Sequence, residues 1–208
     1  MDKFILQGAI FMIRIKGLNC QLGGKEIFKN FNLEIKAGEK IVLNAVSGKG
    51  KTTLFNILLG FQKAQGEIYI DRCKLNKYTI LDIRKKISYV SQDIDFQNKN
   101  VKELIIEIIN YNLNKNKVYY DEILKYLEDF NILDALYKNV RELSGGERQR
   151  LGFAICMGLN REIWLLDEVT ASLDMEMKLK VKDYILNSNA TVLIISHDDI
   201  WDFKEVKW

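Results

Sequence analysis

The sequence predicts an α/β fold with a mainly parallel sheet, an N-terminal antiparallel β lobe and an inserted helical subdomain. Three observations support this class: apolar and polar residues alternate near the N-terminus, short apolar runs recur along the chain, and a helical period of apolar residues fills its middle. Alternation is typical of a strand with one solvated face, whereas an unbroken apolar run is typical of a strand covered on both faces.

Two alternating segments, residues 13–16 and 31–35, predict antiparallel strands that are each followed by a glycine turn. Residues 66–70 are expected to return to the same β lobe. The first part of the chain, residues 1–12, is too short and too weakly basic for a secretory signal, so we expect a short N-terminal extension. Either an extra edge strand or a translation start at Met12 would explain it.

The parallel core is predicted by four short apolar runs, which lie at 41–43, 87–90, 163–166 and 191–195. The first run leads through a glycine-rich loop into a helix expected at 52–59, and a second helix is expected at 175–186. These strands and helices together predict a sheet with its loops gathered at one edge.

Between 101 and 158 the apolar residues recur with helical spacing, as in Leu104, Ile105 and Ile108. This spacing predicts a helical subdomain at about 95–158, inserted into a single domain that spans 13–208. The chain has no proline and no glycine- or serine-rich run that would mark a linker between two domains.

Composition narrows the function classes. The 208 residues are enough to bury a core, and 31 basic and 28 acidic residues are interspersed, with a formal net charge of +3. This balance favours an ordinary solvated surface, so we expect no nucleic-acid partner.

Cys20, Cys73 and Cys156 lack metal-binding spacing and are expected to be small buried side chains in a reducing compartment. No apolar run is long enough to cross a bilayer, and we expect a soluble chain.

Two segments have the character of phosphate-binding loops. Gly145 and Gly146 free the backbone where a polar helix is expected to begin after Ser144. The first amides of a helix lack intrahelical partners and lie at the positive end of its dipole, so such a start binds anions. A second glycine-rich cradle, between a predicted strand and a predicted helix, consists of Ala45, Val46, Ser47, Gly48, Lys49, Gly50, Lys51, Thr52 and Thr53.

The residue types in the second cradle suit a nucleoside triphosphate and its metal ion. Gly48 and Gly50 allow tight turns, Lys51 can bridge β- and γ-phosphate oxygens, and the Thr52 hydroxyl can bind Mg²⁺. Thr53 is expected to add a contact to the α-phosphate. Asp167 ends a predicted buried strand, where its carboxylate can hold the water shell of the magnesium ion.

The run from Leu143 to Glu147 resembles the signature of the ATP-binding cassette (ABC) ATPases, which are the nucleotide-binding subunits of ABC transporters. Residues 143–174 align without a gap with the signature, Walker B and D-loop of that family, and the resemblance extends over about 13–197. The resemblance implies a P-loop NTPase core that binds ATP and Mg²⁺ and hydrolyses ATP.

Further roles follow from the same resemblance. Glu168 would act as the general base that polarises the attacking water. Gln92 would be the Q-loop glutamine, which reaches the metal ion and that water. His197, the only histidine of the chain, would be the H-loop switch that donates to the γ-phosphate. Asp174 would belong to the D-loop, which follows the seam of a dimer.

Several positions depart from the family pattern. Ala45 replaces a common glycine, Val46 replaces a frequent proline, and Lys49 stands where small residues are preferred. Leu22 takes the place of an aromatic residue that usually stacks on adenine. Leucine offers apolar contact without stacking, so we expect weak recognition of adenine and room for GTP to compete.

The resemblance also implies partners. Ser144, Gly145, Gly146 and Asp174 are expected to complete the ATP site of a second subunit, in a homodimer or in a heterodimer with another ABC ATPase. We expect separately encoded integral membrane transporter subunits to dock around Gln92 and the helical lobe, on the cytoplasmic face of the membrane. The alternative is a non-transport ABC ATPase in a soluble assembly or cell-division machinery. The motifs specify neither the transported substrate nor its direction.

Overall fold

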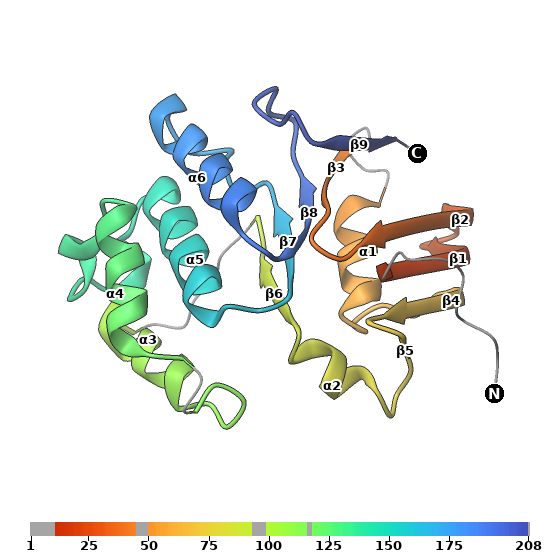
Figure 1. The fold of residues 1–208 in the computed structure, drawn as a ribbon, viewed down its shortest axis with the longest axis horizontal. Coiled ribbons are helices and arrows are strands. Elements are labelled where there is room, and N and C mark those ends of the chain that lie inside the picture. Colours follow the sequence, from red (N-terminus) through yellow and green to blue (C-terminus); the bar gives the residue numbers. More distant parts are fainter. Residues whose placement is uncertain (1–10, 45–49, 93–98, 116–117, 208) are drawn as a thin grey trace.

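The computed structural model describes residues 11–44, 50–92, 99–115 and 118–207 (Figure 1). Most of the extension expected at the N-terminus, residues 1–10, lies outside the described residues. The first strand begins at Phe11, so the last two residues of that expected extension belong to the fold.

An antiparallel sheet forms the N-terminal lobe. Its strands β1 (Phe11–Leu22), β2 (Lys25–Lys36), β4 (Gln65–Ile70) and β5 (Cys73–Lys74) are ordered β2-β1-β4-β5. Alternate residues such as Ile13 and Ile15 are buried, while intervening side chains face solvent. The predicted β lobe is confirmed, and the two-residue strand β5 was not predicted because its sequence is too short to carry a pattern.

A parallel sheet forms the centre of the molecule. Its strands β6 (Ile87–Val90), β7 (Ile163–Asp167), β8 (Thr191–Ile195), β3 (Lys40–Asn44) and β9 (Lys204–Lys207) are ordered β6-β7-β8-β3-β9, and every pairing is parallel. All residues of β7 and β8 are buried, as their unbroken apolar sequences predict. The prediction of an α/β fold is confirmed.

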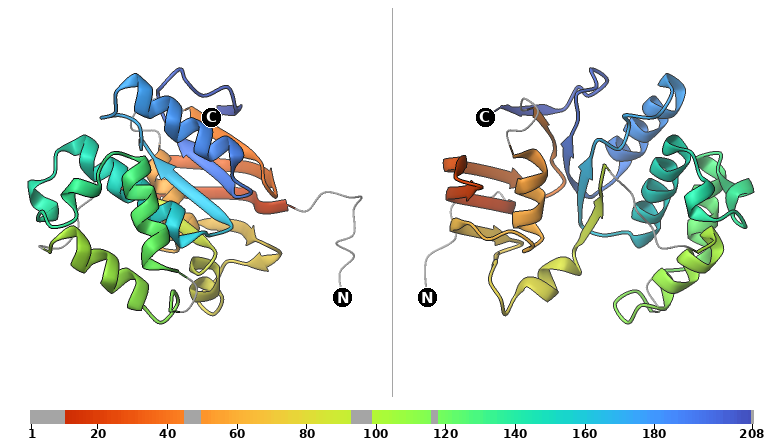
Figure 2. Two further views of the ribbon diagram at one scale, coloured as in Figure 1. Left: turned by 60° about the vertical axis from the view of Figure 1, so that its left-hand side comes forward. Right: turned by 180° about the vertical axis from the view of Figure 1, so that it is seen from behind.

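The parallel sheet separates two buried cores. On one face it packs against the helical lobe and α6 (Met175–Asn187), through alternate residues such as Trp164 and Leu166. On the other face it packs against α1 (Lys51–Leu58) and the antiparallel sheet, through Ile163 and Leu165 (Figure 2). The layers therefore follow directly from the alternation of side chains along each strand.

The helical lobe consists of α3 (Val101–Asn110), α4 (Tyr120–Asp129), the 3₁₀ turns η1 (Leu133–Ala135) and η2 (Val140–Glu142), and α5 (Gly145–Leu159). A further short helix, α2 (Ile80–Arg84), precedes β6. Asn100 caps α3 in a reciprocal capping box with Glu103. Helices were predicted in this region, but α2 was not, because one turn is too short to show a helical period.

Strand β9 was also not predicted from the sequence. Its residues are mostly charged, and as an edge strand it needs no apolar face of its own. Asn44 of β3 donates a hydrogen bond to Glu205 of β9, and Lys204 forms an ion pair with Glu39. These polar contacts secure a strand that lacks an apolar pattern.

The cysteines are free thiols; Cys20 and Cys156 are buried as expected, whereas Cys73 is half-buried. Among the helices of the described ranges, none combines the length and the hydropathy that crossing a membrane requires.

Candidate functional site

The predicted site residues that follow the parallel strands lie at the C-terminal edge of that sheet. Strand β3 leads to α1, β7 ends at Asp167, and β8 is followed by Ser196 and His197. Because β7, β8 and β3 are neighbours in the sheet, the segments that follow them meet at one edge. Of the predicted phosphate loop, Ala45, Val46, Ser47, Gly48 and Lys49 lie outside the described residues.

Gly50 closes the loop and begins the helix. Its φ of 92° lies in the left-handed region, which favours glycine. A Cβ atom at this position would lie 2.1 Å from Cγ2 of Ile27 and 3.6 Å from Cζ of Phe28. The start of β2 therefore packs against the backbone at the beginning of α1, and a larger residue than glycine does not fit without movement.

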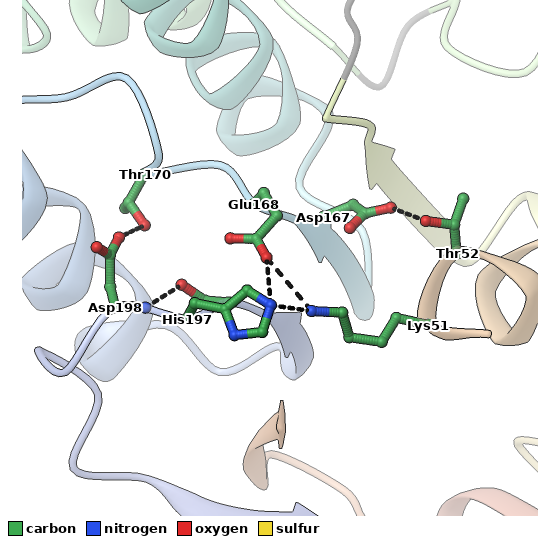
Figure 3. A network of polar contacts seen from close by, with 8 residues as sticks. Lys51, Thr52, Asp167, Glu168, Thr170, His197 and Asp198 are labelled. Carbon is green, nitrogen blue, oxygen red and sulfur yellow. Dashed lines mark hydrogen bonds and ion pairs between the residues drawn. The ribbon is translucent and has the colours of Figure 1, made fainter. Parts of the chain in front are cut away.

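Lys51, Glu168 and His197 converge in front of α1 (Figure 3). The Nζ atom of Lys51 lies 2.5 Å from Nε2 of His197 and 3.5 Å from Oε1 of Glu168. Oε1 of Glu168 is also 3.7 Å from Nε2 of His197. The side chains of Lys51 and Glu168 are largely buried, while that of His197 is 49% exposed. The three residues expected from distant motifs thus form one polar cluster.

A second contact joins α1 to the end of β7. The hydroxyl of Thr52 donates to Oδ2 of Asp167 at 2.9 Å, and Asp167 is 2% exposed. A hydroxyl and a carboxylate at this distance supply the oxygen ligands that Mg²⁺ prefers. With the close backbone approach at Gly50, this arrangement fits a nucleotide phosphate and its magnesium ion.

The backbone of Glu168 is held on both sides. Its φ is 50°, and its N–H donates to the carbonyl of Ile195 at 2.8 Å. Its carbonyl accepts from Nε2 of Gln149 at 3.1 Å, while Oε1 of Gln149 accepts from the N–H of Ser172 at 2.9 Å. Gln149 is 5% exposed. It thereby ties α5 to the loop after β7, a role that no sequence motif indicated.

Helix α5 begins after Ser144, as predicted, and Ser144 forms a capping box with Glu147. Ser144 Oγ accepts from Glu147 N at 3.2 Å, and Ser144 N donates to Glu147 Oε2 at 2.7 Å. The Ser144 N–H lowers the pKa of the Glu147 carboxyl. Ser144 and Gly145 are exposed, and a Cβ at Gly146 would lie 2.8 Å from the carbonyl oxygen of Ser172. Glycine is therefore required where α5 meets that loop.

The contacts of the described residues do not link the remaining predicted residues directly to the side chains of Lys51, Glu168 and His197. Asp174 caps α6 by accepting from Met177 N at 2.8 Å. Gln92 follows β6 and is exposed. No hydrogen bond or ion pair between described residues joins Ser144, Asp174 or Gln92 to Lys51 or Asp167. Thr53 is half-buried in the first turn of α1.

Leu22 ends β1 just before a glycine turn and is 37% exposed. The side chain that closely approaches the start of α1 is that of Ile27, in the strand that follows the turn. No sequence pattern indicated this approach, because it depends on how β2 packs against Gly50 at the start of α1.

A helix that begins at a glycine beyond one parallel strand, with a buried carboxylate two strands away at the same edge of the sheet, is typical of a P-loop nucleotide-binding protein. Relatives narrow the class further. A family model described as ABC transporter matches residues 28–171, and the chain belongs to that family. The family resemblance of the sequence is thus confirmed.

Individual relatives agree with this assignment. The chain is 35% identical over 194 residues to the energy-coupling factor transporter ATP-binding protein EcfA of Aster yellows witches'-broom phytoplasma, which spans 90% of this chain and 70% of that protein. It is 32% identical over 211 residues to the uncharacterized amino-acid ABC transporter ATP-binding protein YhdZ of Escherichia coli K12, over 95% and 82% of the two chains. The structure of cbiO1 from Clostridium perfringens, part of the ABC transporter complex cbiONQ, superposes with a TM-score of 0.72 at 26% identity, over 90% and 79% of the chains.

Proposed function

We propose that this chain binds and hydrolyses ATP to power transport through separately encoded membrane subunits. The observation that carries the proposal is the convergence of Lys51, Glu168 and His197 beside the Thr52–Asp167 pair. The catalytic unit spans 13–208, with its helical subdomain at about 95–158.

Each residue of the cluster has a distinct part in hydrolysis. Lys51 and the backbone after Gly50 bind the phosphates, together with the loop residues 45–49 and Thr53. Glu168 is the general base, which accepts the proton of the attacking water. His197 donates to the γ-phosphate. Bound Mg²⁺ neutralises charge on the phosphate oxygens.

The metal ion would be held by Thr52, Asp167 and Gln92. The first two already lie within hydrogen-bond distance of each other. Gln92 is exposed just after β6, the strand beside β7, and is the third ligand that we propose. Leu22 is the residue proposed to contact the adenine.

A second subunit completes the site. Ser144 and Gly145 are exposed at the start of α5, at the positive end of the helix dipole, which attracts anions. We place Ser144, Gly145, Gly146 and Asp174 against the ATP held by a partner chain, in a homodimer or heterodimer. Hydrolysis then removes the γ-phosphate that bridges the two subunits and lets the dimer open.

Transport is favoured over the alternative of a soluble assembly or cell-division machinery. The relatives described above are named as transporter ATP-binding proteins, and cbiO1 is part of a transporter complex. We therefore place the chain at the cytoplasmic face of a membrane, bound to integral membrane subunits.

The variant Glu168→Gln tests the proposed binding and hydrolysis of ATP. It keeps the shape of the side chain and removes the base, so hydrolysis should fall by about a hundredfold or more while nucleotide binding persists. Glu176→Gln, at an exposed position on α6, is the matched control. Hydrolysis by Glu168→Gln at the wild-type rate would exclude Glu168 as the base.

A second experiment tests the role in transport. The chain should be recovered from membranes together with a polytopic membrane protein. Recovery with soluble partners alone would favour the alternative of a soluble assembly or cell-division machinery.

A further inference from the structure

Asp198 connects the two loops that carry Glu168 and His197 (Figure 3). Its Oδ2 accepts a hydrogen bond from the Thr170 hydroxyl at 2.5 Å. Its Oδ1 forms an ion pair with Lys178 of α6. Thr170 is fully buried, so the contact lies beneath the surface of the site. One carboxylate therefore joins the end of β8, the loop after β7 and helix α6.

Backbone hydrogen bonds of Asp198 and Glu168 hold the segment that carries His197. The N–H of Asp198 donates to Oγ of Ser196 at 3.1 Å, which spans His197, and Ser196 is 2% exposed. One residue before Ser196, the carbonyl of Ile195 accepts from the N–H of Glu168. The backbone segments that carry His197 and Glu168 are thus held relative to each other by these contacts.

The charge of Asp198 strengthens these contacts. Burial opposes its ionisation, but hydrogen bonds from Lys178 and Thr170 outweigh burial and hold the pKa of the carboxyl below its usual value. The group is therefore a carboxylate at neutral pH. Hydrogen bonds to a charged acceptor are stronger than those between neutral groups.

We propose that Asp198 is a positioning residue: it fixes the His197 loop against the Glu168 loop and, through Lys178, couples both loops to α6. Asp174 is the N-cap of α6, so the same contacts connect the hydrolytic cluster to the segment expected at the dimer seam. The proposal rests on the ATPase function proposed above and acts through His197 and Glu168.

The loop after β8 contains a second ion pair with α6, which serves as a matched control for the pair of Asp198 and Lys178. Asp202 pairs with Lys182 of α6 at 2.9 Å, four residues further along both segments. Lys178 and Lys182 have the same side-chain exposure, 16%. The carboxylate of Asp202 is 72% exposed and, among described residues, makes no contact with Thr170.

The first measurement needs neither nucleotide nor activity. His197 is the only histidine in the chain, so in protein without a histidine tag its imidazole gives one set of NMR signals. Lys178→Met should shift these signals, because it removes the ion-pair partner of the Asp198 carboxylate. The residues on either side of His197 in the sequence stay unchanged. Lys182→Met should leave them in place. Unchanged signals in Lys178→Met, or equal shifts in both variants, would overturn the proposal.

The second measurement is the kinetics of ATP hydrolysis. Asp198→Asn keeps the side-chain shape and should lower kcat about tenfold with KM changed less than about twofold, because Lys51 and Thr52 are untouched. Asp202→Asn should change neither constant. An equal loss of kcat in both Asn variants would contradict a specific role for Asp198. If the wild-type chain fails to hydrolyse ATP, the proposed function fails, while the NMR comparison still decides whether Asp198 positions His197.

Discussion

The ammonium nitrogen of Lys51 lies 2.5 Å from Nε2 of His197, although the two residues are 146 positions apart in the chain. Because the lysine is a donor, Nε2 of the imidazole must accept, which places the imidazole hydrogen on Nδ1. A γ-phosphate that binds Lys51 would therefore replace His197 as its partner. The imidazole would then be released to reorient toward the phosphate.

Removing the ammonium group should weaken nucleotide binding itself. In Lys51→Ala the phosphates lose the cation that we propose binds them, and the affinity for ATP should fall by about tenfold or more. Equilibrium titration with ATP and Mg²⁺ measures the loss, with Lys125→Ala on the exposed face of α4 as the control. Wild-type affinity in Lys51→Ala would show that the phosphates bind elsewhere.

A methyl group at Gly50 should distort the phosphate loop. The left-handed backbone costs a non-glycine residue roughly 1–2 kcal/mol, and the new Cβ would also meet Ile27. Gly50→Ala should therefore bind ATP more weakly than wild type. Adding Ile27→Ala removes the closest contact and should restore part of the affinity. No recovery in the double variant would indicate that backbone strain alone causes the loss.

An arginine at position 144 should prevent dimer closure without harming the chain's own phosphate loop. Glu168→Gln is expected to accumulate as an ATP-bound dimer, because the bridging γ-phosphate is not removed. Sedimentation with ATP and Mg²⁺ should show that Ser144→Arg abolishes this dimer while each monomer still binds ATP. Ser144→Ala removes the same helix cap, worth about 1 kcal/mol, without adding bulk, and controls for damage to α5. A stable dimer in Ser144→Arg, Glu168→Gln would contradict the composite site.

The Asp198 contacts should weaken only in acid. The pKa of Asp198 is lower in the folded chain than its ordinary value, so its contribution to stability is complete above the unfolded pKa and is lost as the pH falls through the folded pKa. Unfolding by denaturant should show wild type more stable than Asp198→Asn at neutral pH. The difference should shrink below a pH of about 4. A difference that stays constant down to pH 2 would show that charge does not underlie it.

If Leu22 contacts adenine, Leu22→Tyr should tighten ATP binding by about 1 kcal/mol through a new stacking face. Affinities for ATP and GTP, measured in parallel, separate base stacking from phosphate binding. Phe28, another candidate to cover the base, is 2% exposed, whereas Ile27 is half-buried beside Gly50. Unchanged affinity in a folded Leu22→Tyr variant would argue against Leu22 and favour Ile27 as the residue that contacts the base.

The sequence predicted those parts of the site that local patterns encode. Buried strands such as β7 and β8 are recognisable from unbroken apolar runs, and Lys51, Glu168 and His197 each lie in a motif at a strand end. Contacts between distant segments have no such pattern. Gln149 lies between Arg148 and Arg150 in the polar first half of α5, where nothing in the sequence sets it apart, and only the packing of α5 on the loop after β7 shows what it binds. The Thr170–Asp198 contact could not be predicted for the same reason, because the fold brings together two segments that are 28 residues apart.

Strand β9 has a practical consequence for anyone who modifies this chain. It runs parallel to β3, and Lys207 pairs with Asn44, the last residue before the phosphate loop. A label or fusion attached directly after β9 would therefore emerge beside Asn44, at the same edge of the sheet as the proposed nucleotide site. Cutting the chain before Lys204 would leave β3 as an open edge, with unpaired backbone groups that invite aggregation. Labels placed on the exposed face of α4 would avoid both effects.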